Sequence, residues 1–306
     1  MKNKNKNKVL TCLAAVYLAI FFLCWWSLTS QSQESVSGAT YVGSEMCLTC
    51  HQDVLKTYEH TIHFKIAQDP RNELEQKGCE SCHGPGSMHS EDPNNVKPLV
   101  SFAKKTKTPV EEQNNACLQC HQKTHLNWEG SIHDSKDLAC ATCHHIKENR
   151  SDRFLLAKAE TDELCGTCHK SQKAKTLKSY HMGIRDGKLE CSSCHNPHGS
   201  TTDKLLVENS VNETCYKCHA EKRGPFLWPH PPVMENCLNC HDPHGTNHNK
   251  MLVTHVRRLC QRCHIETRHP TTPQPEDNLY IVNHACANCH SQIHGSNHPS
   301  GVRFQR

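Results

Sequence analysis

The chain has 306 residues, of which 22 are cysteine and only 17 are aromatic. With a mean hydropathy of -0.72, it is too poor in apolar side chains to build a conventional core of that size, because their burial would not offset the entropy of ordering the chain. The formal net charge of +4 comes largely from four lysines in the first eight residues, so it indicates no nucleic-acid partner.

The N-terminal segment has the pattern of an export signal. The early lysines precede the apolar run 9–26, and residues 37–39 (Ser-Gly-Ala) offer a small-residue cleavage site. Residues 1–39 are therefore predicted to be a signal peptide, with an uncleaved membrane anchor as the alternative, since 18 apolar residues come close to spanning a bilayer. Residues 40–306 are then exported, to a compartment where paired thiols oxidise unless other chemistry captures them.

The exported part repeats one motif, Cys-x-x-Cys-His, ten times, and every cysteine after residue 24 belongs to it. Two thiols one helical turn apart can add to the two vinyl groups of a porphyrin, and the histidine then faces the iron as its proximal ligand. We therefore predict ten covalently attached c-type haems. The attachment residues are Cys47, Cys50, Cys79, Cys82, Cys117, Cys120, Cys140, Cys143, Cys165, Cys168, Cys191, Cys194, Cys215, Cys218, Cys237, Cys240, Cys260, Cys263, Cys286 and Cys289, and the proximal histidines are His51, His83, His121, His144, His169, His195, His219, His241, His264 and His290.

Zinc ribbons and disulfide scaffolds also use Cys-x-x-Cys pairs. Neither requires a histidine directly after each pair, and only 26 of the 306 residues are histidine. A histidine at all ten of these positions therefore favours haem.

Sixteen histidines remain, which is enough to give each iron a second imidazole. Two imidazoles saturate the iron and suit electron transfer, whereas an enzyme needs an open axial position. A histidine follows 11 or 12 residues after the histidine of most odd-numbered motifs and 3 to 6 residues after that of most even-numbered ones. The predicted distal ligands are His63, His89, His133, His145, His181, His198, His230, His244, His269 and His294.

Two positions depart from this spacing. Three residues after His144 the chain has Lys147, which leaves His145 as the nearest candidate. After His264 the choice lies between His269, which is favoured, and His284, with His298 as a reserve.

The motifs follow one another every 27 residues or so, and the intervening stretches are rich in Pro, Gly and Asn. The predicted fold is mostly irregular, with short α-helices, little or no β-sheet and an elongated stack of haems. Residues 40–306 are predicted to form one cytochrome domain of five two-haem repeats, since CHNPHGSTTDKLLV and CHDPHGTNHNKMLV recur with a 46-residue period. One predicted helical segment is 162–173, with Thr161 as its cap.

The stretches SVNETCYKCHAEKRGPFLWPH, CHDPHG and CHSQIHGSNHPSG resemble decahaem cytochromes of the MtrA and DmsE type, and the resemblance covers residues 41–306. It implies a periplasmic protein threaded into an outer-membrane β-barrel porin. Its partners would be a periplasmic or inner-membrane cytochrome donor and an extracellular multihaem cytochrome or reductase. The resemblance places all the predicted distal histidines except His145 on ligand positions. Lys147 departs from the family pattern Cys-His-x-x-His.

Three functions remain open at this point. An outer-membrane electron conduit is favoured. A soluble periplasmic shuttle to a nitrite or sulfoxide reductase is the alternative. A multihaem enzyme would need a five-coordinate haem, and no motif replaces its histidine with lysine as cytochrome c nitrite reductases do.

Overall fold

The structure is a computed structural model that describes residues 38–96, 99–265, 286–299 and 301–304. The apolar run of the predicted signal segment lies outside these ranges, and no described helix is long and apolar enough to cross a membrane. The chain divides into two compact units, one formed by 1–42 and 84–99 and the other by 43–83 and 100–306. All ten motifs belong to the second unit.

In the first unit, helix α7 (Ser87–Glu91) is joined to the residues before the first motif. The backbone N–H of Thr40 donates to Ser87 Oγ at 2.8 Å, and the N–H of Ser87 donates to the Thr40 carbonyl at 3.1 Å. These reciprocal bonds fix the start of α7, which carries His89.

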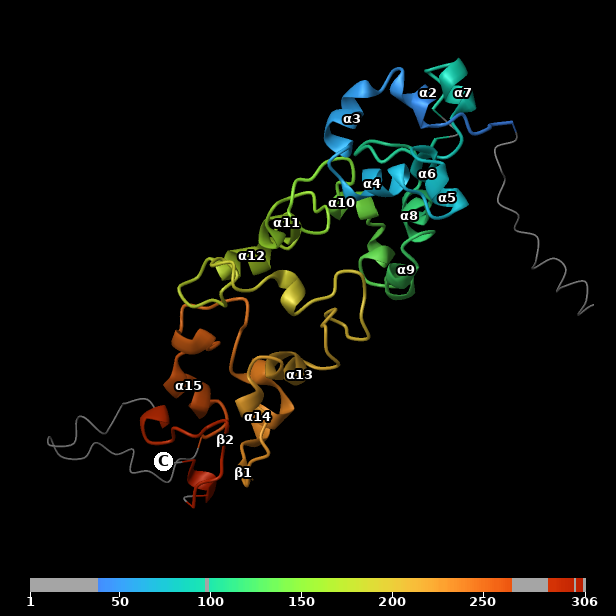
Figure 1. The fold of residues 1–306 in the computed structure, drawn as a ribbon. Coiled ribbons are helices and arrows are strands. Elements are labelled where there is room, and N and C mark those ends of the chain that lie inside the picture. The colour runs from blue at the N-terminus through green and yellow to red at the C-terminus, as the bar shows by residue number, and fades with distance from the viewer. Residues whose placement is uncertain (1–37, 97–98, 266–285, 300, 305–306) are drawn as a thin grey trace, which may run out of the picture. The chain divides into compact units, whose positions relative to one another are not determined.

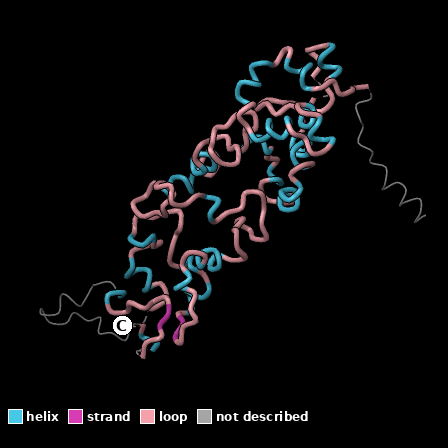
Figure 2. Tube along the Cα trace, viewed as in Figure 1, coloured by secondary structure: helices cyan, strands magenta, loops and turns pink. Residues whose placement is uncertain are grey.

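The described helices of the second unit are short, with four to nine residues each, and loops join them (Figures 1 and 2). The α-helices are α2 (Ser44–Leu48), α3 (Gln52–Tyr58), α4 (Ile62–Gln68), α5 (Glu73–Gln76), α6 (Glu80–His83), α8 (Val110–Leu118), α9 (Gln122–Trp128), α10 (Cys140–Cys143), α11 (Thr161–Cys165), α12 (Lys170–Thr176), α13 (Val211–Tyr216), α14 (Pro231–Glu235) and α15 (Val256–Gln261). The 3₁₀ turns are η1 (Asp134–Lys136), η2 (Cys191–Ser193), η3 (Ala220–Lys222), η4 (Cys237–Asn239), η5 (Asn249–Met251), η7 (Cys286–Asn288) and η8 (Gly301–Arg303).

The sheet content is small. In the described residues, strand β1 (Trp228–Pro229) pairs with β2 (Gly295–Ser296) in antiparallel register, with Trp228 opposite Ser296. The expectation of short helices with little sheet is therefore confirmed.

The helix predicted over 162–173 is two helices, α11 and α12. Thr161 is the first helical residue of α11 and not its cap, since Glu160 holds the cap position. The helix is interrupted after Cys165 and resumes at Lys170, and His169 between them has a φ of −84° and a ψ of 56°, which are not helical. In a continuous helix the chain would keep its direction through His169. The interruption lets the chain change direction after the motif.

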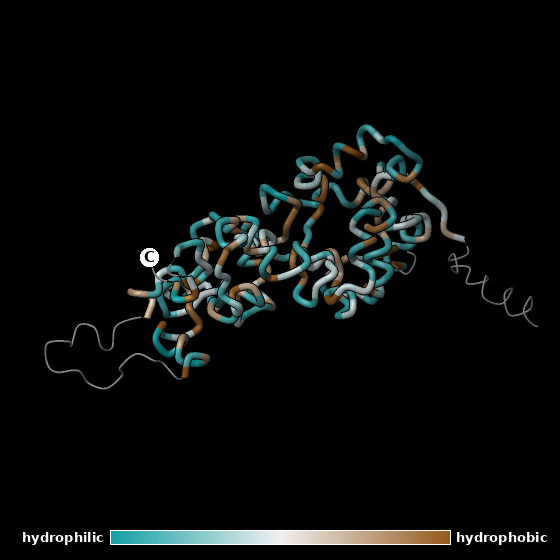
Figure 3. Tube along the Cα trace, turned by 90° about the horizontal axis from the view of Figure 1, so that it is seen from below, coloured by the Kyte–Doolittle hydropathy of each residue, from teal (hydrophilic) through white to brown (hydrophobic). Residues whose placement is uncertain are grey.

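Side-chain burial confirms the lack of a conventional core. Among the described residues the buried hydrophobic side chains are Leu118, Trp128 and Leu205. Figure 3 shows hydrophobic residues interspersed with hydrophilic ones along the chain. A chain of this length cannot hold a defined fold on so little apolar packing, so something other than side chains has to fill its interior.

Candidate haem site

Each motif is a single tight turn that presents its two thiols and its histidine together. In the third motif the N–H of Cys120 donates to the Cys117 carbonyl at 3.2 Å, and that of His121 donates to the same carbonyl at 3.0 Å. The same pair of bonds recurs in eight other motifs, and in the fourth the N–H of His144 donates to the Cys140 carbonyl at 2.9 Å. All 20 motif cysteines are free of disulfide bonds. In the described ranges no three His, Cys, Asp or Glu side chains converge as a structural zinc site would require.

Successive motifs lie near one another in sequence order. The first cysteines of the two motifs in each successive pair are near enough to affect each other's pKa through a thiol hydrogen bond, and the second cysteines of neighbouring pairs are near enough to do so through their charges. The thiol contacts are Cys47–Cys79, Cys117–Cys140, Cys165–Cys191, Cys215–Cys237 and Cys260–Cys286. The electrostatic contacts are Cys82–Cys120, Cys143–Cys168, Cys194–Cys218 and Cys240–Cys263. Each motif therefore lies next to the one that follows it in the chain.

Six of the proximal histidines face a predicted distal histidine. A metal–imidazole bond of about 2.0 Å on each side, with the nitrogen about 1.1 Å from the ring centre, places two axial rings roughly 6 Å apart. The observed centroid distances are 6.1 Å for His63–His121, 6.2 Å for His133–His169, 5.9 Å for His144–His198, 6.2 Å for His195–His244, 6.3 Å for His230–His264 and 6.2 Å for His241–His294.

The partners in these pairs come from different repeats. A proximal histidine of an odd-numbered motif faces a ring from the segment two motifs earlier, as His169 faces His133. A proximal histidine of an even-numbered motif faces a ring from the segment two motifs later, as His144 faces His198. His145, the nearest candidate by sequence, is not the residue opposite His144. The predicted distal histidines therefore connect segments of the chain that are two motifs apart.

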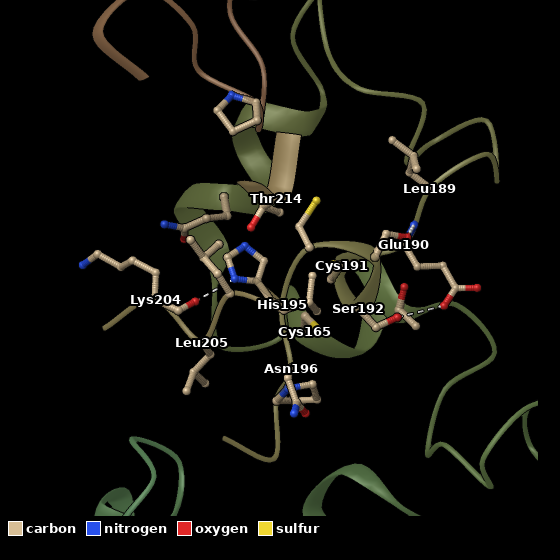
Figure 4. A pocket seen from close by; sticks show the side chains of 18 of the residues that line it. Cys165, Leu189, Glu190, Cys191, Ser192, His195, Asn196, Lys204, Leu205 and Thr214 are labelled. Carbon is tan, nitrogen blue, oxygen red and sulfur yellow. Dashed lines mark hydrogen bonds between the residues drawn. The ribbon is translucent and has the colours of Figure 1, made fainter. Parts of the chain in front are cut away.

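The even-numbered motifs also share a second anchor. Nδ1 of each proximal histidine bonds a backbone carbonyl further along the chain, at 2.7 Å for His83–Val100, 2.8 Å for His144–Phe154, 2.7 Å for His195–Lys204 and 2.9 Å for His241–Lys250, and also in His290–Arg303. Figure 4 shows the bond from His195 to Lys204, with Cys165 and Cys191 beside it. The bond fixes the ring and leaves Nε2 free for a metal, as second-sphere partners do in metal sites generally.

In four of these five loops the residue after the acceptor carbonyl has a positive φ. The values are 50° for Leu155, 53° for Leu205, 56° for Met251 and 51° for Phe304. Non-glycine residues rarely adopt this left-handed region, which costs roughly 1–3 kcal/mol. Its recurrence at the same place in successive repeats indicates that orienting the histidine offsets the strain.

Burial favours the neutral, metal-binding form of five of the paired imidazoles. It lowers the pKa of His63, His198, His230 and His244, and it lowers the pKa of His294 to about 4. A neutral imidazole has a free nitrogen lone pair, so these rings can act as ligands at neutral pH.

One continuous cavity of about 5110 Å³ runs along the motifs from the second to the tenth and is lined from Tyr58 to Phe304. Shared among these nine motifs, it gives roughly 570 Å³ for each, within the usual 300–1,000 Å³ of a cofactor pocket. Inside the described structure, Trp128 Nε1 and His63 Nδ1 are buried without a hydrogen-bond partner. A cavity of this size beside such donors fits porphyrins, whose propionates accept hydrogen bonds. The cysteines and paired histidines would hold them, and the bound iron would supply a one-electron couple.

Four predicted distal ligands are not among the six pairs. His89 lies on α7 in the first unit, and His269 lies outside the described residues, as does its alternative His284. Nδ1 of His181 bonds the Met182 carbonyl at 2.6 Å. His145 has its Nδ1 4.0 Å from a carboxylate oxygen of Glu148.

Sequence reasoning missed three kinds of contributor to the site. The carbonyl acceptors carry no side-chain signal, so only the backbone path reveals them. The glycines that follow the distal histidines, such as Gly199 after His198, did stand in the repeated Pro-His-Gly pattern. Asn114 and Asn212, which tie paired motifs together, each stand three residues before the first cysteine of a motif.

Repeated Cys-x-x-Cys-His turns, facing imidazoles and a shared cavity in place of an apolar core define a multihaem c-type cytochrome, an electron-transfer protein. Residues 181–224 and 230–269 match the doubled CXXCH motif family, and residues 79–158 match the NrfB-like cytochrome c-type family.

The similarity to one curated relative covers most of the chain. The chain is 43% identical over 276 residues to the multiheme cytochrome MtrA of Shewanella baltica, which covers 86% of this chain and 81% of that protein. It is 32% identical over 133 residues to the cytochrome c-type protein NrfB of Escherichia coli, covering 42% of this chain and 65% of that protein. The chain belongs to the family of the multihaem cytochrome MtrA. This family agrees with the prediction of an electron carrier rather than an enzyme.

Proposed function

We propose that this protein carries ten c-type haems in a single row and conducts electrons across the outer membrane from within a porin. The proximity of each motif to the next in sequence order supports this proposal, because electron tunnelling rates fall steeply with distance and conduction needs closely spaced haems. The motifs would act as five two-haem repeats, each joined by its first-cysteine contact.

The ligand set follows the interlocking pattern. The six facing pairs would each hold one iron. The same pattern assigns His181 to the iron of His219, since the segment after the fifth motif serves the seventh. Iron saturated by two imidazoles changes charge without making or breaking bonds, which suits a carrier.

The cellular setting is part of the proposal. Residues 1–39 would direct export to the periplasm, and the haem row would sit in an outer-membrane β-barrel porin. A periplasmic or inner-membrane cytochrome would donate electrons, and an extracellular multihaem cytochrome or reductase would accept them. The similarity to MtrA over most of the chain supports this choice.

A soluble periplasmic shuttle is the second candidate. The similarity to NrfB proteins of two organisms favours it, but each match covers less than half of this chain. Fractionation separates the two candidates, since a conduit co-purifies from outer membranes with a β-barrel protein and a shuttle stays in the soluble periplasmic fraction.

The decisive experiment measures mass and conduction together. The intact holoprotein should carry ten haems by mass spectrometry. In vesicles containing its porin, it should pass electrons from an enclosed reductant to an external dye. Replacing Cys191 and Cys194 with alanine removes one middle haem, and transfer should then fall more than tenfold, whereas insertion in the porin should persist. A mass well short of ten haems, or unchanged transfer in the double variant, would refute the conduit.

A further inference from the structure

The haem station at Cys79 and Cys82 differs from the other even-numbered stations. The segments after motifs six, eight and ten contribute His198, His244 and His294, which face proximal histidines two motifs earlier. By the same pattern, the segment after the fourth motif serves His83. In that segment Lys147 stands three residues after its proximal histidine, at the position that His198 and His244 hold in their own segments.

The surroundings of Lys147 place it at this station. Lys147, His83 and Cys82 all line the same cavity, and the charge of Lys147 acts to lower the pKa of both neighbours. The residue is half-buried, and no described carboxylate lies within ion-pair distance of its ammonium group. A half-buried lysine without a carboxylate partner, lining the same cavity as His83, is available as a ligand.

His145 is the competing imidazole. Its backbone N–H donates to the Leu155 carbonyl at 2.7 Å, and its Nδ1 is buried without a hydrogen-bond partner, 4.0 Å from a carboxylate oxygen of Glu148. The ring that contacts His83 is that of Phe102, at 5.4 Å and 73°. Among the described residues, no ring contact joins His145 to His83, in contrast to the six facing pairs.

We propose that Nζ of Lys147 is the distal ligand of the haem held by Cys79, Cys82 and His83. The row then contains one station with histidine and lysine as its axial ligands. This inference rests on the proposed haem row. Coordination uses the lone pair of a neutral amine, so the ammonium group releases one proton to solvent as the Nζ–Fe bond forms, and no electron is transferred in that step.

The lysine ligand would make this station chemically distinct. An amine donates to iron through a σ bond only, whereas an imidazole also has a π system that interacts with the iron d orbitals. The axial ligand is one of the main levers on haem potential. The station nevertheless stays six-coordinate, so it remains a carrier and offers no open site to a substrate.

Near-infrared magnetic circular dichroism of the oxidised holoprotein tests the proposal, because the low-spin charge-transfer band lies at a different energy for histidine–amine than for bis-histidine iron. The wild-type protein should show the histidine–amine band with about a tenth of the low-spin intensity. Lys147→Ala should abolish that band. Lys147→His should convert it to the bis-histidine type while the total low-spin intensity stays unchanged.

Two control variants complete the design. Lys188→Ala removes an exposed lysine and should leave every band in place. His145→Ala should also retain the histidine–amine band. The proposal is overturned if the wild-type protein lacks this band, or if the band survives in Lys147→Ala. If Lys147→Ala does not fold, Lys147→His still decides. A full complement of ten haems without the band refutes only the lysine ligand, whereas a deficit of haems in the wild-type protein refutes the row itself.

Discussion

At the scale of single residues, the placement of distal histidines depends on glycine. Gly199 follows His198 with φ +127°, and a Cβ there would lie 1.8 Å from the Asn127 carbonyl oxygen. Gly245 follows His244 and approaches the Lys175 carbonyl in the same way, at 2.3 Å. Each glycine lets the loop with a distal histidine rest directly on the helix, α9 or α12, that follows an earlier odd-numbered motif.

Gly199→Ala should therefore displace His198 from the iron of His144. The Cβ meets fixed backbone, so the loop has to move and one haem should become high-spin. Electron paramagnetic resonance of the oxidised protein would detect this as a new high-spin ferric signal. Gly130→Ala is the matched control, because Gly130 has φ +73° with nothing within 4 Å of its Cβ position. Equal high-spin signals in both variants would show that backbone strain, and not close approach, is responsible.

The ring planes of the paired histidines predict two spectroscopic classes. The planes lie within 12–22° of parallel in four pairs but cross at 63° in His63–His121 and 58° in His133–His169. Near-parallel imidazoles split the iron d orbitals strongly and produce a rhombic signal, whereas crossed rings produce a signal with one large g value. Both signals are expected in the oxidised protein, and His133→Ala should weaken the large-g signal while His244→Ala should weaken the rhombic one.

At the scale of elements, a polar side chain joins the two motifs in three of the five pairs, and in two of them this side chain, Asn114 or Asn212, is buried. Asn212 Oδ1 accepts from the Cys237 N–H at 2.8 Å, and its Nδ2 donates to the carbonyls of Val233 and Met234. Asn114 and Ser44 accept from Cys140 and Cys79 in the corresponding places. Each of these bonds ties the helix that carries one motif to the start of the next motif.

Asn212→Ala should lower stability by about 1–3 kcal/mol, because the variant leaves a half-buried N–H of Cys237 and two carbonyls without their partner. The measurement is the midpoint of chemical denaturation, followed by haem absorbance. Asn209→Ala is the control, since Asn209 is exposed and makes only a 3.5 Å contact with Thr201. A midpoint for Asn212→Ala that matches the control would contradict this role.

At the scale of the whole molecule, the cofactors replace the core. The described residues bury few hydrophobic side chains, while a cavity of about 5110 Å³ runs beside the motifs. Porphyrins, thioether bonds and axial ligands would supply the contacts that apolar side chains supply elsewhere, so folding and haem attachment should be coupled.

Protein produced without haem attachment should consequently be unfolded. With a reductant present to keep the thiols free, its circular dichroism should lack the helical signal of the holoprotein, and limited proteolysis should cleave it throughout 40–306. The holoprotein, digested in parallel, should resist. A protease-resistant, helical apoprotein would contradict the replacement of the core by haem.

The sequence by itself determined the local chemistry. A motif such as Cys117-x-x-Cys120-His121 is complete within five consecutive residues, so its geometry follows from one helical turn and needs no distant contact. The same locality explains why short helices and sparse sheet could be predicted. The prediction of one helix over 162–173 was wrong, because the helix is interrupted at the motif that ends with His169. Local helix propensity does not encode this change of direction.

Only the tertiary structure decided which histidines meet. Spacing pointed to His198 as a ligand but did not give its partner, His144, which belongs to the motif two places earlier. Pairing across repeats depends on how the loops cross, and carbonyls such as that of Lys204 carry no side-chain signal at all. Only the tertiary structure also relates Lys147 to His83, since the two residues belong to different pairs of motifs.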